Sequence, residues 1–179
     1  RSQPNGARIE DRDAWAVDLV CGPQTGPEGS LIAAARASGV TVAIEPTLVR
    51  EINPPKDLRA LARLTRIMRW RRYAIVHTHS SKAGILGRWA AKLAGTPVIV
   101  HTVHGWGHHE RQHWAVQRLY IWLEKLTLPI TDKLIAVSSV DIEKGLSAGI
   151  GKPEDYVLIR SGIELDRFGC PQRPRAETR

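Results

Sequence analysis

The chain has 179 residues and a mass of 19.9 kDa; 42% of the residues are hydrophobic, 25% are charged, and the formal net charge is +8. This balance predicts one globular domain, because a disordered chain holds fewer apolar residues, and no apolar run is long enough to cross a membrane. Two cysteines, Cys21 and Cys170, exclude a disulfide framework and a four-thiolate zinc site, so we expect the reduced thiols of a cytoplasmic protein.

From Trp15 onward, short β-rich runs alternate with helical patterns. Strands are predicted at residues 15–21, 40–45, 74–79, 97–103, 133–138 and 156–160. Helices are predicted at residues 28–39, 56–72, 80–95, 110–128 and 140–149. This alternation predicts an α/β fold, a Rossmann-like parallel sheet flanked by helices. We expect Trp15 and Trp89 to be buried, together with an apolar stripe in the fourth helix that comprises Leu119, Trp122, Leu123 and Leu126.

Most of the positive charge lies in residues 56–72, which hold seven cations and a single acid, Asp57, so this segment alone carries +6. Leucines and Met68 recur there at helical spacing, which predicts an amphipathic helix with a basic outer face. That face is either simply solvated or attracted to an anionic membrane surface, where Trp70 would lie at the interface. A nucleic acid is not expected as a partner, because no helix-turn-helix, zinc-finger or aromatic platform pattern accompanies the charge.

Ligands of open parallel sheets bind at the carboxyl ends of the strands, so the residues there are the first candidates for a site. The strand at 74–79 ends with His77 and His79, which alternation places on one face. The next helix starts at Ser80-Ser81-Lys82, where free N–H groups and a lysine form an anion site; alternatively a serine only caps the helix and Lys82 is solvated. Gly84 and Gly87 predict a close approach of this helix to the sheet.

A second candidate follows the strand at 97–103, where His104 precedes a loop with Gly105 and Gly107. An imidazole there can donate or accept protons near neutral pH. Trp106 and Trp114 border this loop, where their rings would stack on a sugar or lie under a lipid headgroup. The sequence contains no G-x-G-x-x-G after a strand, no P-loop and no G-x-S-x-G elbow. No metal is predicted, because the pairs His109/His113 and His77/His79 lack a completing carboxylate.

The run VHTHSSKAGILGRWAAKLAGTPVIVHTVHGW, residues 76–106, resembles the N-terminal domain of family-4 glycosyltransferases, which have the GT-B fold. The segments LIAVSSVDIEKG and YVLIRSGIELDRF are similar to the passage of that family into its interdomain linker. The resemblance implies the acceptor-binding half of a retaining transferase. Such an enzyme moves a sugar from a nucleotide-sugar donor to a glycan or lipid-linked acceptor in bacterial polysaccharide synthesis, without a cofactor or an essential metal.

Carried over residue by residue, the resemblance implies that His104 is catalytic. It implies substrate contacts for Ser80, Ser81 and Lys82 in the acceptor-side loop and for Arg160 and Ser161 in the linker that faces the cleft. From their place at the strand ends we expect substrate contacts also for His79, Gly105, Trp106 and Ser138. The resemblance also implies a remnant of a truncated first helix at 1–14, the domain itself at 15–160, and at 161–179 a linker to an absent second domain. On this reading the first strand is missing, the sheet is compromised at its centre, and the chain is inactive alone. The strands at 15–21 and 74–79 would then pair directly, leave a gap filled by another chain or by residues 1–12, or leave the domain marginally stable.

Two alternatives remain open from the sequence. A nucleotide-sugar epimerase has the same architecture, but it would be distinguished by carboxylates at the strand ends. A non-catalytic module that binds anionic membranes through residues 56–72 is the other. For the transferase we expect a cytoplasmic location, with peripheral contact to the inner face of the plasma membrane.

Overall fold

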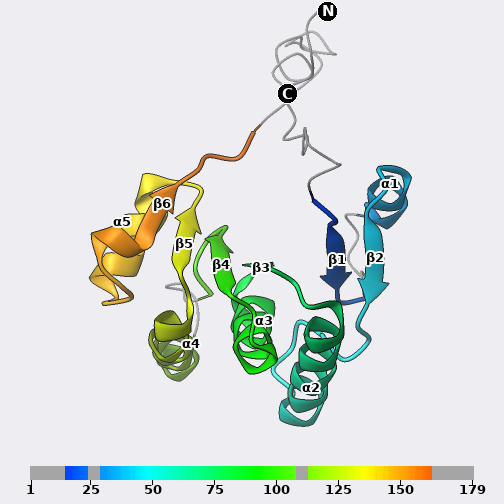
Figure 1. The fold of residues 1–179 in the computed structure, drawn as a ribbon. Coiled ribbons are helices and arrows are strands. Elements are labelled where there is room, and N and C mark those ends of the chain that lie inside the picture. Colours follow the sequence, from blue (N-terminus) through cyan, green and yellow to red (C-terminus); the bar gives the residue numbers. More distant parts are fainter. Residues whose placement is uncertain (1–14, 24–28, 108–112, 163–179) are drawn as a thin grey trace, which may run out of the picture. The chain divides into compact units, whose positions relative to one another are not determined.

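A computed structural model describes residues 15–23, 29–107 and 113–162 (Figure 1). Val17–Ile159 form one compact unit. Trp15, Ala16 and residues 160–162 belong to a second unit. Within the described residues the strands are β1 (Asp18–Cys21), β2 (Thr41–Ile44), β3 (Ile75–His79), β4 (Val98–Val103), β5 (Lys133–Ala136) and β6 (Tyr156–Leu158). The helices are α1 (Ile32–Ala37), α2 (Pro54–Arg71), α3 (Ser81–Ala94), α4 (Trp114–Thr127) and α5 (Ser139–Ser147).

The predicted elements are all present, which confirms the α/β, Rossmann-like class. Short 3₁₀ turns at Leu128–Ile130 and Pro153–Asp155, which the sequence did not suggest, precede β5 and β6. The expected start of the fourth helix, residues 110–112, lies outside the described residues. The ends of the helices follow local chemistry: Asn53 caps α2 by accepting a hydrogen bond from the Lys56 amide, and Gly95 closes α3 in the left-handed conformation.

All strand pairs are parallel, but they form two sheets instead of one. One sheet has the order β3-β4-β5-β6 and the other contains β1 and β2. The interruption therefore falls where the family resemblance predicted it, since β1 and β3 do not pair and no strand among the described residues lies between them. Side chains connect the two parts: Tyr73 donates a hydrogen bond of 2.6 Å to Asp18, and Arg63 forms a 3.2 Å ion pair with Glu45.

In Figure 1, α3 and α4 lie below the four-stranded sheet, and α2 lies beside α3 on the side of β1 and β2. The core beneath β3 and β4 is a cluster of Leu64, Met68, Val76, Ala90, Ala91 and Ile99. The predicted close approach of α3 is confirmed, because a Cβ on Gly84 would lie 2.4 Å from the His101 ring and a Cβ on Gly87 would lie 2.9 Å from the Thr78 methyl group. Helix α3 therefore packs closely against both β3 and β4.

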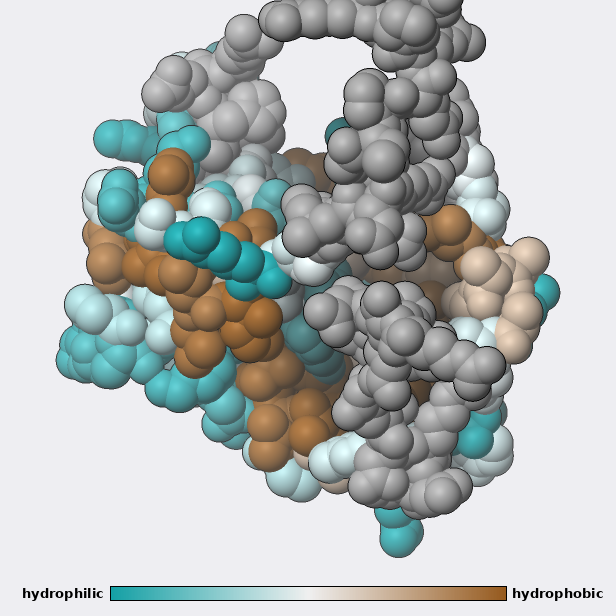
Figure 2. Space-filling view, turned by 90° about the horizontal axis from the view of Figure 1, so that it is seen from above, coloured by the Kyte–Doolittle hydropathy of each residue, from teal (hydrophilic) through white to brown (hydrophobic). Residues whose placement is uncertain are grey.

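The side chains that alternate away from α3 are exposed in the described structure. On β3 these are Ile75, His77 and His79, whereas Val76 and Thr78 are buried against the helix. Val98, which pairs with Ile75 in the register of β4, is exposed as well. Figure 2, seen from above, shows hydrophobic surface among hydrophilic groups on the side of the molecule opposite α2–α4.

Two burial predictions were wrong. Trp15 is 52% exposed, and on α4 three of the four expected core residues, Leu119, Trp122 and Leu126, are exposed as well. The buried residues of α4 are Glu124 and Thr127, because this helix meets a buried cation on α3. Arg88 is fully buried and its Nη2 donates to Glu124 Oε2 at 2.6 Å. An ion pair thus occupies the inward face that hydrophobic periodicity had assigned to leucines.

Candidate active site at the carboxyl ends of β3 and β4

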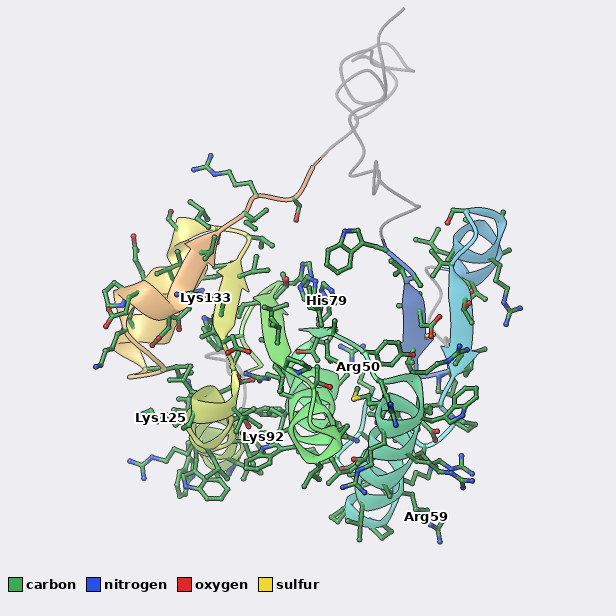
Figure 3. All side chains as sticks on the ribbon, viewed as in Figure 1. Arg50, Arg59, His79, Lys92, Lys125 and Lys133 are labelled. Atoms are coloured by element: carbon green, nitrogen blue, oxygen red, sulfur yellow. The ribbon has the colours of Figure 1, made fainter. Side chains whose placement is uncertain are left out.

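Three histidine rings gather where β3 and β4 end. The rings of His77 and His79 lie with centroids 4.3 Å apart, which confirms that they share a face. His79 Nδ1 and His104 Nε2 are 3.0 Å apart, a hydrogen-bond distance, and His77 Nε2 lies 2.7 Å from Thr102 Oγ1. Figure 3 labels His79 at this end of the strands. Parallel pairing of β3 with β4 thus brings together two residues that are 25 positions apart in the sequence.

The surroundings of His77 and His79 favour the uncharged form of these two rings. Although both rings are exposed at one face, the packed neighbours keep water from part of each. This loss of hydration, followed by the nearby His77 and His104, lowers the pKa of His79 to about 4. The same loss of hydration and the neighbouring His104 also lower the pKa of His77. A neutral imidazole donates through one nitrogen and accepts through the other. His79 and His104 use one nitrogen each for their mutual contact. The other nitrogens, His79 Nε2 and His104 Nδ1, form no hydrogen bond to a described residue, so each can form one with a hydroxyl group of a ligand.

Ser80 joins β3 to α3 in an unusual backbone conformation. Its φ of 65° and ψ of 150° lie in a region that is essentially restricted to glycine. Ser80 occupies the N-cap position, but its side chain makes no capping hydrogen bond to a described residue, so the capping alternative does not apply to this hydroxyl. Strained backbone of this kind is concentrated at functional sites. Both features agree with a binding role for Ser80, which stays a prediction.

Lys82 has a clear structural partner. Its Nζ forms a 2.5 Å ion pair with Asp57 Oδ1, donates to the Val49 carbonyl at 2.9 Å, and also donates to the Glu51 carbonyl. The lysine therefore fastens the loop before α2 to the first turn of α3, with its charge balanced by a carboxylate. The alternative of a solvated Lys82 is wrong, whereas the predicted contact to a substrate anion remains untested.

The loop after β4 is anchored to α5. Gly105 has a φ of 120°, which side-chain-bearing residues rarely adopt. Trp106 donates from Nε1 to the Asp141 carbonyl at 2.7 Å and packs against the core cluster of β5 and β6. Ser138 caps α5, accepting from the Asp141 amide at 3.2 Å and donating to Asp141 Oδ2 at 2.6 Å. Trp106 thus holds the loop against α5, and Ser138 caps that helix; the predicted substrate contacts of both residues stay predictions.

Ser81 lies next to the same loop, because a Cβ on Gly107 would come within 2.5 Å of Ser81 Oγ. Arg160 and Ser161 are exposed residues of the second unit, so their position relative to the histidines is not described. His109 falls outside the described residues. In the described part of the chain, no three His, Cys, Asp or Glu side chains form a group able to hold a metal ion.

The sequence did not single out His101 as part of this region. His101 is buried on the α3 side of β4, and its Nδ1 lies 2.9 Å from Thr78 Oγ1. Burial, followed by the charge of Arg88, lowers the pKa of His101 to about 3, so this ring is neutral. Gly84 of α3, which leaves space for the ring, was the signal that could have revealed it.

Residues 7–162 match the family model of the glycosyl transferase 4-like domain. The chain belongs to the glycosyl transferase 4-like family. It is therefore a glycosyltransferase domain, which confirms the resemblance that residues 76–106 carried.

Among curated proteins, the chain is 36% identical over 156 residues to the UDP-Gal:alpha-D-GlcNAc-diphosphoundecaprenol alpha-1,3-galactosyltransferase of Escherichia coli. The match covers 87% of this chain but only 39% of that relative. Two solved structures share the fold at 16% identity. A glycosyltransferase from Rickettsia africae ESF-5 aligns with a TM-score of 0.57 over 90% of this chain and 47% of its own, and a UDP-N-acetylglucosamine 2-epimerase with 0.53 over 86% and 52%.

Proposed function

We propose that this domain is the acceptor-binding half of a retaining glycosyltransferase. The enzyme would move a sugar from a nucleotide-sugar donor to a polyprenyl-diphosphate-linked acceptor, in the synthesis of a bacterial polysaccharide. The E. coli relative, whose name specifies a diphosphoundecaprenol acceptor, supports the lipid-linked class. The contact between His79 and His104 at the carboxyl ends of β3 and β4 is the observation that carries the proposal.

This pair suits the binding of sugar hydroxyl groups. Because each imidazole contributes one nitrogen to the pair, the rings hold each other in orientation and leave the second nitrogen of each for a ligand. His104 is the proposed catalytic residue, which would hydrogen-bond the reacting hydroxyl groups. His79 would orient His104, and Ser80 and Ser81 would contact the acceptor beside the first turn of α3.

We further propose that the domain contacts an anionic membrane surface through residues 56–72. The outer face of α2 carries Lys56, Arg59 and Arg66, which form no ion pair with a described residue. In Figure 3, Arg59 points away from the body of the molecule. Trp70 and, on α4, Trp114 and Trp122 are exposed, and aromatic residues of this kind favour the membrane interface. No helix of the described chain is both long and apolar enough to span a bilayer.

A nucleotide-sugar epimerase is the second candidate, since one of the solved structures with this fold is an epimerase. Acidic groups at the strand ends would support it. The residues that directly follow β3 and β4, Ser80 and His104, are not acidic. Incubating the full-length protein with nucleotide sugars and no acceptor discriminates the two, because an epimerase converts the donor alone and a transferase requires the acceptor.

Sugar transfer by variants of the full-length protein tests the proposal. With a panel of labelled nucleotide sugars and a polyprenyl-diphosphate-linked acceptor, His104→Ala should lower kcat by roughly 100-fold or more, the usual scale for a positioned acid–base or hydrogen-bonding group. His113→Ala is the matched control, since His113 is an exposed histidine at the start of α4. Equal rates for the wild type and His104→Ala would remove His104 from the mechanism.

A further inference from the structure

An apolar pocket lies between the helices, beside the candidate active site. It has a volume of about 150 Å³ and lies among the start of α2, the first two turns of α3 and the middle of α4. Its apolar wall is formed by Ile52, Ile85, Leu86, Leu119, Tyr120 and Leu123. At one end lie Lys82 and Asp57, whose charges neutralise each other in the ion pair described above. The pocket therefore offers a hydrocarbon wall without an unmatched charge.

The pocket and the candidate active site share a wall. A Cβ placed on Gly107 would lie 2.5 Å from Ser81 Oγ and 3.2 Å from Tyr120 Cδ1. Gly107 is thus a close neighbour of both Ser81 and Tyr120, and Lys82, which lines the pocket, directly follows Ser81. A ligand whose polar end lies near Ser81 and His104 can accordingly extend an attached apolar chain into the pocket.

The size of the pocket selects a short length of chain. An apolar cavity of about 150 Å³ stays dry and holds a six-carbon ring, so this pocket fits about one five-carbon isoprene unit. Ile52 and Leu119 at its edge are substantially exposed, and an apolar ligand would remove their surface from water. We propose that the pocket binds the isoprene unit nearest the diphosphate of the acceptor. This inference rests on the lipid-linked acceptor of the proposed function.

The chain offers a matched pair of variants. Leu119 and Leu126 lie on the same helix and are 40% and 46% exposed, but only Leu119 lines the pocket. Because both side chains are partly exposed, replacing either by Gln should leave the fold intact. Farnesyl diphosphate, a short prenyl diphosphate, is the probe, and inorganic diphosphate reports on binding of the polar end alone.

Calorimetric titration of the full-length protein should give a dissociation constant for farnesyl diphosphate that is about five- to tenfold weaker in Leu119→Gln, the effect of losing part of one leucine's buried surface. Leu126→Gln should stay within twofold of the wild type, and inorganic diphosphate should bind both variants equally. A photoreactive farnesyl diphosphate should label Leu119–Leu123 or Ile85–Leu86 in the unmodified protein. Equal weakening in both variants, or labelling elsewhere, would overturn the pocket.

Two other outcomes are decisive as well. If anionic vesicles bind both leucine variants more weakly than the wild type while farnesyl diphosphate binds all three equally, the surface contacts membrane lipid and the pocket proposal is wrong. If the full-length protein transfers no sugar to any acceptor, the proposed function fails, whereas the farnesyl diphosphate titration still decides whether a prenyl chain occupies the pocket.

Discussion

Loss of the carboxylate of Glu124 should strongly destabilise the domain, because it leaves a buried cation without its counter-charge. Arg88 is fully buried and Glu124 is 3% exposed. Besides the 2.6 Å contact to Glu124, Arg88 donates from Nε to the Gly84 carbonyl at 3.1 Å and from Nη1 to Thr131 Oγ1 at 3.3 Å. These neutral acceptors cannot balance the charge, and the tight packing of α3 leaves the guanidinium no route to solvent.

Breaking a buried ion pair by removing one partner costs about 3–5 kcal/mol. For Glu124→Leu we therefore expect a large share of a domain stability of about 5–15 kcal/mol to be lost. At roughly 2–4 °C per kcal/mol for a chain of this size, Tm should fall by roughly 6–20 °C. Replacing both partners, as Arg88→Met with Glu124→Leu, removes the buried charge as well as its partner, and such exchanges are often neutral or stabilising.

Thermal and urea unfolding, followed by circular dichroism, measure both effects. The free energy of unfolding of the single variant should fall by about 3–5 kcal/mol, and the double variant should regain most of that loss. A double variant as unstable as the single one would mean that the cost arises from lost packing. A single variant within about 1 kcal/mol of the wild type, the worth of an exposed pair, would mean that water reaches Arg88.

Three further predictions follow from described contacts. The pKa of buried His101 is lowered to about 3, so below pH 6.5 the unfolded chain binds a proton that the folded chain does not bind. Stability should therefore fall as pH drops below 6.5, by about 1.4 kcal/mol per pH unit for this group. Urea unfolding at pH 7.5 and 5.0 should show the loss and His101→Gln should reduce it, whereas equal losses would exclude His101 as the cause. Gly84→Ala should destabilise the domain by about 1–3 kcal/mol despite a gain of about 1 kcal/mol in helix propensity, since its Cβ would lie 2.4 Å from the His101 ring. Gly87→Ala places its Cβ against only a methyl group, so its Tm should fall less. A larger fall in Tm for Gly87→Ala would contradict the packing argument. Binding to anionic vesicles should weaken in the double variant Arg59→Ala/Arg66→Ala. It should also weaken between 0.1 M and 1 M salt, because the screening length falls from about 10 Å to about 3 Å over this range. Flotation with neutral vesicles is the control, and equal binding to neutral and anionic vesicles would exclude charge as the cause of binding.

The sequence predicted the elements well because their signals are local. Alternating apolar residues and helix-ending glycines need no knowledge of the rest of the chain, and Gly95 ends α3 as expected. The general rule that ligands of parallel sheets bind at the carboxyl ends of the strands pointed to both His79 and His104, whereas the 3.0 Å contact between them came only from the structure. The resemblance of residues 76–106 then supplied the family, which spacing alone could not.

Contacts between distant residues were beyond the sequence. The inward face of α4 was assigned to leucines because nothing in the helix shows that Glu124 has a buried partner 36 positions earlier, at Arg88. The pairing of Lys82 with Asp57 likewise joins helices that are separated in the chain, so the lysine looked solvated or ligand-binding. Trp106 was predicted to face a ligand, and only the tertiary structure reveals its hydrogen bond to Asp141 on α5.

The central claim is that the carboxyl ends of β3 and β4 bind the acceptor, and histidine ring NMR of the full-length protein tests it most directly. Titration with a soluble prenyl-diphosphate-linked sugar should shift the ring resonances of His79 and His104, which assignment by single His→Gln variants identifies. His113, exposed at the start of α4, should not move and serves as the internal control. Saturable binding that leaves both His79 and His104 unchanged would contradict the account.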